Sequence, residues 1–314
     1  MNPLFEKYQD APWLTYSAGE PSKEASEIVK PEMLKLRAAY PMGPGVEMDY
    51  LDDTTPQGIT RSDIEMKGGN KLYIYKDETK HVGEDRLVFY LHGGGYIRGN
   101  GKYNRCNAMI HLEKLGLPVA CCEYRLAPKN REPAAITDVT AAYRYLVDDL
   151  GYDPAKMIIA GDSAGGCLAL SLGLRIKANG EPMPIGFVLY SPSTNLHMSS
   201  ESHHYNLGKD IIFPNGVREV IRFYADEDRL DNPDVSPFFG DFTGFPKTYF
   251  CAEDTEVLCS DTLECSAKMH ENGVDVRTHI YHGLWHAFPA LHPMPPLLPE
   301  TDEVFNKIKE FLLL

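Results

Sequence analysis

One short stretch of the chain places a serine where it could act as a nucleophile. Residues 161–165 read Gly-Asp-Ser-Ala-Gly, a G-x-S-x-G pentapeptide. An apolar run, 157–160, precedes it and a segment rich in Leu and Ala follows it. A strand, a sharp turn and a helix N-terminus are therefore predicted, with Ser163 at the turn. Free N–H groups at a helix start favour developing negative charge, which suits an acyl-transfer nucleophile.

A second glycine-rich stretch could stabilise an oxyanion. His92-Gly-Gly-Gly95 directly follows the apolar run 87–91. Backbone N–H groups without a shielding side chain can converge on a substrate oxygen, and we expect Gly93, Gly94 and Ala164 to donate them. The alternatives are a flexible loop or a phosphate cradle, but residues 99–103 lack the Gly-Lys-Ser/Thr of a Walker loop.

The serine needs an imidazole to accept its proton, and the last strand-like run, 276–281, is followed by two histidines. His282 and His286 both qualify by position, while His279 lies within the run. His286 is favoured because it lies further into the loop, next to aromatic residues. The pair at spacing four resembles zinc ligands, but Gly283 between them disfavours a helix and no glutamate adjoins, so no metal is expected.

A carboxylate should hold the histidine, and it should follow a strand between the serine and the histidine. The run 248–252 is followed by several acids, and spacing alone leaves the choice open. Most of them are expected to be solvated loop charges. The candidates are Glu253, Asp254, Glu256 and Asp261.

The elements that must carry these residues alternate along the chain. Continuous apolar runs at 87–91, 118–122, 157–160, 185–190, 248–251 and 276–281 are typical of buried strands. Helical patterns lie between them, at 136–150, 163–177 and 304–311. This alternation predicts an α/β fold with a mostly parallel central sheet flanked by helices.

Two segments interrupt the alternation. Residues 1 to about 45 precede the first predicted strand, and residues 196–235 follow a strand end, where α/β folds place ligands. Both are interpreted as a helical cap on a single domain spanning residues 1–314. Three histidines in the insertion, expected to be exposed polar residues rather than metal ligands, are His197, His203 and His204.

Composition excludes several classes of function. The 314 residues contain 31 Lys+Arg and 45 Asp+Glu, a formal net charge of −14. This acid excess disfavours binding to nucleic acid and to anionic lipid. No run approaches the about 20 apolar residues of a membrane span, and no secretory signal is visible. Seven cysteines, an odd number, favour reduced thiols and a cytoplasmic location.

Together these motifs resemble a known family. The segments HGGGYIRG (92–99), EYRLAP (123–128), GDSAGG (161–166), NPDVSP (232–237) and GLWHAF (283–288) are similar to those of the hormone-sensitive-lipase group, bacterial family IV, of α/β hydrolases. The resemblance covers about residues 70–314. It implies an α/β-hydrolase fold with a cap, and a carboxylesterase that needs neither cofactor nor metal.

The same resemblance implies roles for single residues. Ser163 would be the nucleophile and His286 the base, with an oxyanion hole from Gly93, Gly94 and Ala164. The family's acid usually opens an Asp-Pro-Leu sequence and sometimes a Glu-Val-Leu sequence. Here Glu256-Val-Leu258 stands at the matching place, so Glu256 is favoured over Asp254.

The sequence supports general expectations about the substrate, and it leaves other functions open. Short- to medium-chain acyl esters are expected because no segment is typical of a long lipid-anchoring lid. An amidase or acyltransferase with the same triad, and a non-catalytic small-ligand receptor on the same fold, are the alternatives. The sequence leaves a homodimer open. Aromatic residues that could line the pocket are Tyr96, Phe213, Phe223, Tyr224 and Trp285.

Overall fold

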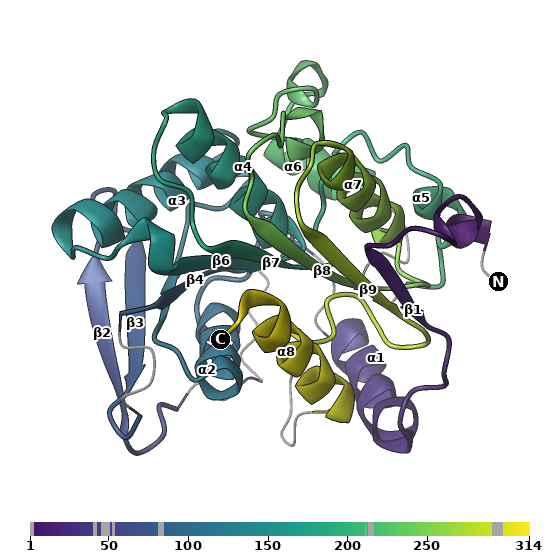
Figure 1. Cartoon of the computed structure of the whole chain (residues 1–314), viewed down its shortest axis with the longest axis horizontal. Coiled ribbons are helices and arrows are strands. Elements are labelled where there is room, and N and C mark those ends of the chain that lie inside the picture. Colours follow the sequence, from purple (N-terminus) through teal and green to yellow (C-terminus); the bar gives the residue numbers. More distant parts are fainter. Residues whose placement is uncertain are drawn as a thin grey trace.

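A twisted sheet runs through the centre of the protein in the computed structural model (Figure 1). The structure describes residues 3–39, 43–44, 51, 54–80, 85–210, 212, 217–290 and 298–314. Within them nine strands pair in the order β1-β9-β8-β7-β6-β4-β5-β3-β2. The strands are β1 (Leu14–Ser17), β2 (Ile59–Glu65), β3 (Lys71–Asp77), β4 (Leu87–Leu91), β5 (Val119–Cys122), β6 (Met157–Asp162), β7 (Gly186–Tyr190), β8 (Lys247–Glu253) and β9 (Val276–Tyr281).

The sheet is parallel from β1 through β9, β8, β7, β6 and β4 to β5, and only β3 runs against its neighbours. The central strands β4, β6 and β7 are buried at every position, as the continuous apolar runs predict. The prediction of an α/β-hydrolase fold is confirmed. Because parallel strands end at a common edge, the loops after β4, β6, β7, β8 and β9 meet there.

Helices cover both faces of the sheet (Figure 1). In that view α1, α2 and α8 lie below the sheet, and α3, α4 and α7 lie above it. The helices are α1 (Lys30–Ala39), α2 (Lys102–Leu115), α3 (Ala134–Arg144), α4 (Ala164–Ala178), α5 (Ser202–Tyr205), α6 (Arg218–Tyr224), α7 (Cys259–Glu271) and α8 (Pro299–Leu312). Shorter helical turns are η1 (Pro3–Tyr8), η2 (Glu24–Val29), η3 (Tyr145–Asp149), η4 (Pro154–Lys156), η5 (Glu227–Arg229) and η6 (Pro237–Phe239).

Three strands were not predicted from the sequence. The four-residue β1 lies in the segment expected to belong to the cap, yet it pairs with β9, with Leu14 opposite Thr278. This part of residues 1–45 therefore completes the sheet. Strands β2 and β3 form the opposite edge, and β2 is mostly solvent-exposed. An exposed edge strand lacks the apolar run that marks a buried one, which explains why the pattern missed it.

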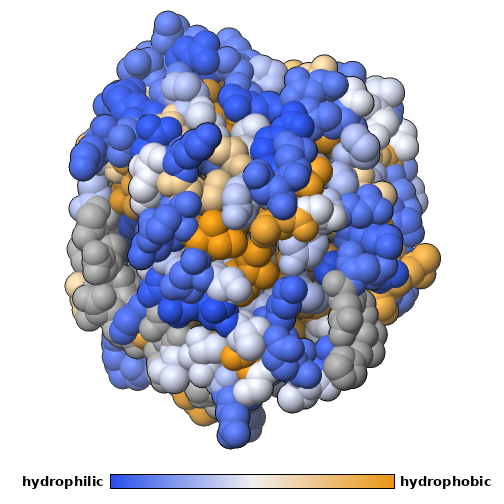
Figure 2. Space-filling view, turned by 90° about the vertical axis from the view of Figure 1, so that its left-hand side faces the viewer, coloured by the Kyte–Doolittle hydropathy of each residue, from blue (hydrophilic) through white to orange (hydrophobic). Residues whose placement is uncertain are grey.

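The face of the molecule turned to the viewer in Figure 2 is mostly hydrophilic. A small apolar area lies near its middle. No helix in the described part of the chain is long and apolar enough to cross a bilayer.

Helix α4 packs closely on the sheet because its first turn contains two glycines, Gly165 and Gly166. A Cβ built on Gly165 would lie 2.0 Å from the carbonyl oxygen of Leu91 and 2.5 Å from that of His92. A Cβ on Gly161 would lie 2.5 Å from the carbonyl oxygen of Gly165. The G-x-S-x-G glycines are therefore required by backbone contacts between β4, β6 and α4.

Substitution Gly165→Ala should destabilise the protein although alanine favours helices. The methyl group meets backbone carbonyls that cannot rotate away, so we expect a loss of about 1–3 kcal/mol or more in the free energy of unfolding, measured with urea. The control is Gly19→Ala, whose Cβ would have no neighbour within 4 Å. It should change stability by less than about 0.5 kcal/mol. Equal stability of the two variants would contradict this account of the packing.

Candidate active site

Ser163 occupies a strained turn at the edge where the parallel strands end. It lies between β6 and α4 with φ 53° and ψ −119°, a left-handed φ that L-residues rarely adopt. Its N–H donates to the carbonyl of Tyr190 at 2.8 Å, and its own carbonyl accepts from Ser193 N–H at 3.1 Å. These bonds to the loop after β7 hold the turn, and the side chain remains 6% exposed.

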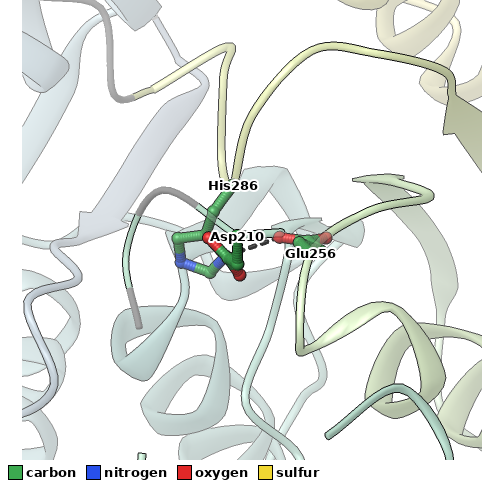
Figure 3. Close-up of side chains that lie close together, drawn as sticks. All are labelled: Asp210, Glu256 and His286. Atoms are coloured by element: carbon green, nitrogen blue, oxygen red, sulfur yellow. Dashed lines mark hydrogen bonds and ion pairs between the residues drawn. The ribbon is translucent and has the colours of Figure 1, made fainter. Parts of the chain in front are cut away.

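His286 and Glu256 face each other from neighbouring loops (Figure 3). Glu256 follows β8 and His286 follows β9, and their Oε2 and Nδ1 atoms lie 2.5 Å apart. His286 is 3% exposed and Glu256 is fully buried. Because β6, β8 and β9 end at one edge of the sheet, the serine, carboxylate and imidazole are carried by loops at that common edge, with β7 between β6 and β8. This pair is the combination favoured from the sequence.

The alternative acid has other partners. Asp254 Oδ2 accepts a hydrogen bond from the Tyr16 hydroxyl at 2.8 Å and lies 2.9 Å from His282 Nδ1. The structure thus separates two histidine–carboxylate pairs, His282 with Asp254 and His286 with Glu256. The third histidine, His279, lies within β9.

The acids of the loop are not solvated, so that expectation was wrong. Glu253, Asp254, Glu256 and Asp261 are at most 2% exposed. Buried carboxylates require donors, and each has them. Glu253 accepts from Thr255, both N–H and hydroxyl, while Asp261 Oδ1 accepts from two N–H groups, those of Thr194 and Asn195, at 2.9 Å each.

A serine hydroxyl supports the acid from the loop after β7. Ser191 follows β7 with φ 48° and is 1% exposed. Its Oγ accepts the N–H of Ala287, the residue after His286, at 2.9 Å, and its hydroxyl interacts with the Glu256 side chain. One hydroxyl therefore ties the histidine loop to the acid loop. No motif in the sequence analysis marked this residue.

Gly93, the first glycine of the glycine-rich loop, was expected to donate its N–H to the oxyanion. The N–H of Gly93 donates to Asp162 Oδ1 at 2.8 Å, so it has a partner within the protein. Asp162 also accepts from the hydroxyls of Tyr90 and Tyr103. The carboxylate next to Ser163 therefore anchors the loop. A Cβ on Gly93 would lie 2.2 Å from Asp162 Oδ2, which explains why glycine is needed there.

The next two glycines have backbones that turn the chain. Gly94 has φ 110° and Gly95 has φ 63°, and a Cβ on Gly94 would lie 2.3 Å from the Arg98 carbonyl oxygen. His92 packs beneath them, stacked on Tyr124 with ring centroids 4.2 Å apart. Burial lowers the pKa of His92, so it stays neutral. Its role is structural, and the loop is held in one shape.

The aromatic residues expected at a pocket are mostly packed. Tyr96 is 1% exposed and stacks on Tyr224 of α6 with centroids 3.7 Å apart, and Trp285 is also 1% exposed. Phe223 is 37% exposed. Phe213 lies outside the described residues. The Tyr96–Tyr224 stack joins the glycine-rich loop to the inserted segment.

The three histidines of the insertion differ in exposure and in their partners. His204 is exposed, and His197 pairs with Asp231 at 2.8 Å, partly exposed. His203 was expected at the surface but is buried, with Nε2 2.6 Å from Asp261 Oδ2. Burial opposes the charged ring, but the Asp261 carboxylate outweighs burial and raises the pKa of His203.

One group of side chains has the composition of a metal site. Asp210, Glu256 and His286 are buried, and one ligand atom from each lies within 4.8 Å of the others (Figure 3). The hydrogen bonds of these atoms argue against metal binding. His286 and Glu256 bond to each other, and both Asp210 oxygens accept backbone N–H groups. The donor set therefore fits a hydrogen-bonded imidazole better than a cation.

Electrostatics favour a protonated imidazole at this position. Burial opposes the charge on His286, but Glu256, Asp210 and Asp162 outweigh it, so the pKa of His286 is raised from its usual range. A neutral His286 can accept a proton, and the surrounding carboxylates stabilise the imidazolium that results.

Comparison with known proteins agrees with this geometry. A family model described as an alpha/beta hydrolase fold matches residues 88–290. An esterase of Acinetobacter venetianus is 32% identical over 228 residues, covering 72% of this chain and 74% of the relative. A crystal structure of an esterase from the bacterial hormone-sensitive lipase family has 25% identity and a TM-score of 0.80, covering 94% of this chain and 98% of that one.

A further similar structure is that of EstE5 soaked with p-nitrophenyl butyrate, with 27% identity, a TM-score of 0.77 and coverage of 90% of this chain and 97% of that one. Residues 88–290, which the family model matches, include the nucleophile turn, the glycine-rich loop and His286. The chain therefore belongs to the alpha/beta hydrolase fold family and is a carboxylic ester hydrolase of the hormone-sensitive-lipase type.

Proposed function

We propose that ester hydrolysis proceeds through Ser163, His286 and Glu256. The observation that carries this proposal is the 2.5 Å contact between His286 Nδ1 and Glu256 Oε2, both buried, at the sheet edge where Ser163 occupies its strained turn. A carboxylate on Nδ1 fixes the tautomer in which Nε2 is the proton acceptor. Asp254 is not given this role because its oxygen bonds to Tyr16 and His282.

The first half of the reaction transfers the acyl group to the enzyme. The Ser163 hydroxyl attacks the ester carbonyl while His286 Nε2 takes the hydroxyl proton. A tetrahedral intermediate forms with the negative charge on the former carbonyl oxygen. The intermediate collapses, the bond to the alcohol oxygen breaks, and the imidazolium gives its proton to the leaving alcohol.

Backbone donors would stabilise the oxyanion, and we assign them to Gly94, Gly95 and Ala164. Gly93 is replaced in this role because its N–H is bonded to Asp162. Ala164 opens α4, where the first N–H groups of the helix have no helical acceptor. Removal of one such donor typically costs about 10²–10³ in rate.

The second half releases the acid. A water molecule gives a proton to neutral His286 and attacks the acyl-serine carbonyl. The second tetrahedral intermediate collapses, its bond to Ser163 Oγ breaks, and the imidazolium returns the proton to that oxygen as the carboxylic acid leaves. The same three side chains serve both halves, so no cofactor is required.

A cap limits the substrate in this proposal. It comprises residues 196–235 together with helical parts of residues 1–45. The stack of Tyr224 on Tyr96 joins the insertion to the segment after the glycine-rich loop. The ion pair of Arg229 with Glu132 at 2.8 Å joins it to the segment before α3. Short- to medium-chain acyl esters are the proposed substrates, and the soak of EstE5 with p-nitrophenyl butyrate supports that size.

A cytoplasmic location is proposed on the state of the thiols. None of the seven cysteines, all of which lie in the described part of the chain, forms a disulfide bond, and six of them are buried. Reduced thiols of this number are typical of a reducing compartment.

Substitution Ser163→Ala should abolish cleavage of p-nitrophenyl butyrate. The loss of kcat should be on the order of 10⁶-fold, since no other group supplies the nucleophile. Wild-type activity should decrease from butyrate to palmitate esters, and a p-nitroanilide of the same acid should be cleaved far more slowly. Cleavage that persists in Ser163→Ala would contradict the proposal. Faster cleavage of the anilide would favour an amidase, and binding without turnover would favour a receptor.

A second pair of variants separates the two candidate acids. Glu256→Gln should lower kcat on the order of 10⁴-fold, because the imidazole loses the group that fixes its tautomer. Asp254→Asn should retain kcat within about tenfold, because its partners are Tyr16 and His282. Circular dichroism would check that both variants fold. A larger loss in Asp254→Asn than in Glu256→Gln would reverse the assignment.

A further inference from the structure

The inserted segment, residues 196–235, carries three polar side chains four residues apart. They hold the loop after β8, which contains Glu256. The Ser202 hydroxyl donates to the carbonyl of Val257 at 2.6 Å. The Asn206 amide donates to the carbonyls of Asp254 and Glu256, each at 2.9 Å. All of these contacts bind the backbone around Glu256, so the insertion fixes the loop that carries the acid.

Asp210 is the third member of this series, and it faces the histidine. Its Oδ2 accepts the Val257 N–H at 2.8 Å, and its Oδ1 accepts the Ile212 N–H at 2.8 Å. It is 5% exposed, and one of its oxygens lies within 4.8 Å of ligand atoms of both Glu256 and His286. Figure 3 shows the Asp210 carboxylate beside the imidazole, on a different element from Glu256.

The contact between Asp210 and Val257 is explained by the buried N–H of Val257. In an Asp-Pro-Leu sequence the residue after the acid has no N–H, whereas the Glu256-Val-Leu258 of this chain presents one in a buried place. A buried N–H without an acceptor is costly, and Asp210 supplies the acceptor. The carboxylate that does so is negatively charged and lies next to the base.

We propose that Asp210 is a positioning residue for the reaction, which holds the Glu256–Val257 backbone and places a second negative charge beside His286. The inference rests on the proposed role of His286 as base. The cap segment then acts on catalysis as well as on the substrate, since it supplies part of the electrostatic environment of the base.

The groups that face His286 come from three elements. Glu256 lies on the loop after β8, Asp210 on the insertion and Asp162 at the end of β6. Glu253 lies near Asp210 and Glu256, but burial raises the pKa of its carboxyl well above the usual range, so it is not counted among these charges. Each negative charge favours the imidazolium, so removal of the Asp210 charge should lower the pKa of His286. Because the neutral ring is the base, activity should then persist to lower pH.

The test is the pH dependence of kcat/KM for p-nitrophenyl butyrate in wild type and Asp210→Asn. This quantity reports the ionisation of the free enzyme, and EDTA in every buffer removes adventitious divalent cations. Asparagine has nearly the same shape but no charge, and its single oxygen can accept only one of the two N–H groups, those of Ile212 and Val257. We expect the acidic limb of the profile to move to lower pH. At neutral pH the loss of kcat should be smaller than in Glu256→Gln.

A matched control is Asp261→Asn, which removes another buried carboxylate that accepts two backbone N–H groups. Its ring partner is His203, not His286. It should lower the melting temperature and leave the midpoint of the acidic limb in place. Asp210→Ala, which removes both charge and acceptor, should move the limb in the same direction as Asp210→Asn and lose more activity.

Three outcomes would overturn the proposal: an acidic limb of Asp210→Asn that coincides with that of wild type, one that moves to higher pH, or an equal movement in Asp261→Asn. Failure of the underlying function is seen separately, as activity that survives in Ser163→Ala or His286→Ala. Inactive Ser163→Ala and His286→Ala with an unchanged Asp210→Asn profile would refute the role of Asp210 alone.

Discussion

The site is organised around the buried carboxylate of Asp162. It lies directly before Ser163 and accepts hydrogen bonds from Tyr90 on β4, from the Gly93 N–H and from Tyr103 on α2. A buried charge is costly unless several donors surround it, and here three donors come from three elements. The nucleophile turn and the glycine-rich loop are thereby held at a fixed separation. Every later step, from attack to oxyanion stabilisation, needs that separation.

Backbone strain gathers at the same edge of the sheet. Among the described residues, left-handed φ values at positions other than glycine occur at Tyr96, Ser163, Ser191, Met198, Ala287 and Leu313. All but the last lie in loops that follow β4, β6, β7 and β9. Such conformations cost of order 1–3 kcal/mol each and persist only where surrounding packing enforces them. The rigid parallel sheet supplies that packing, so the loops can present side chains that a relaxed turn would point elsewhere.

The acidic residues at the end of β8 and directly after it have specific structural roles. Their carboxylates are buried, and their side-chain partners differ: Glu253 bonds to Thr255, Asp254 to Tyr16 and His282, Glu256 to His286, and Asp261 to His203. Except for Thr255, these partners come from segments at least 28 residues away in the chain. The fold therefore sorts chemically similar groups into different roles through the hydrogen bonds that each one receives.

Much of the architecture follows from local sequence. The apolar runs predicted the central strands because a parallel strand covered on both faces must be apolar throughout, and the G-x-S-x-G turn predicted the place of Ser163 because only glycine fits beside the neighbouring backbone. The order of the motifs, read through the resemblance to the hormone-sensitive-lipase group, singled out His286 and favoured Glu256.

Other features were decided by the tertiary structure alone. Spacing could not separate Glu256 from Asp254, because the partner of Asp254 is Tyr16, 238 residues away. Sequence placed the Gly93 N–H in the oxyanion hole, whereas Asp162 accepts it. Asp210 carried no signal, since a lone acid in an insertion is ordinary. Local sequence determines which backbone shapes are allowed, but the direction of a side chain depends on donors and charges that only folding brings near.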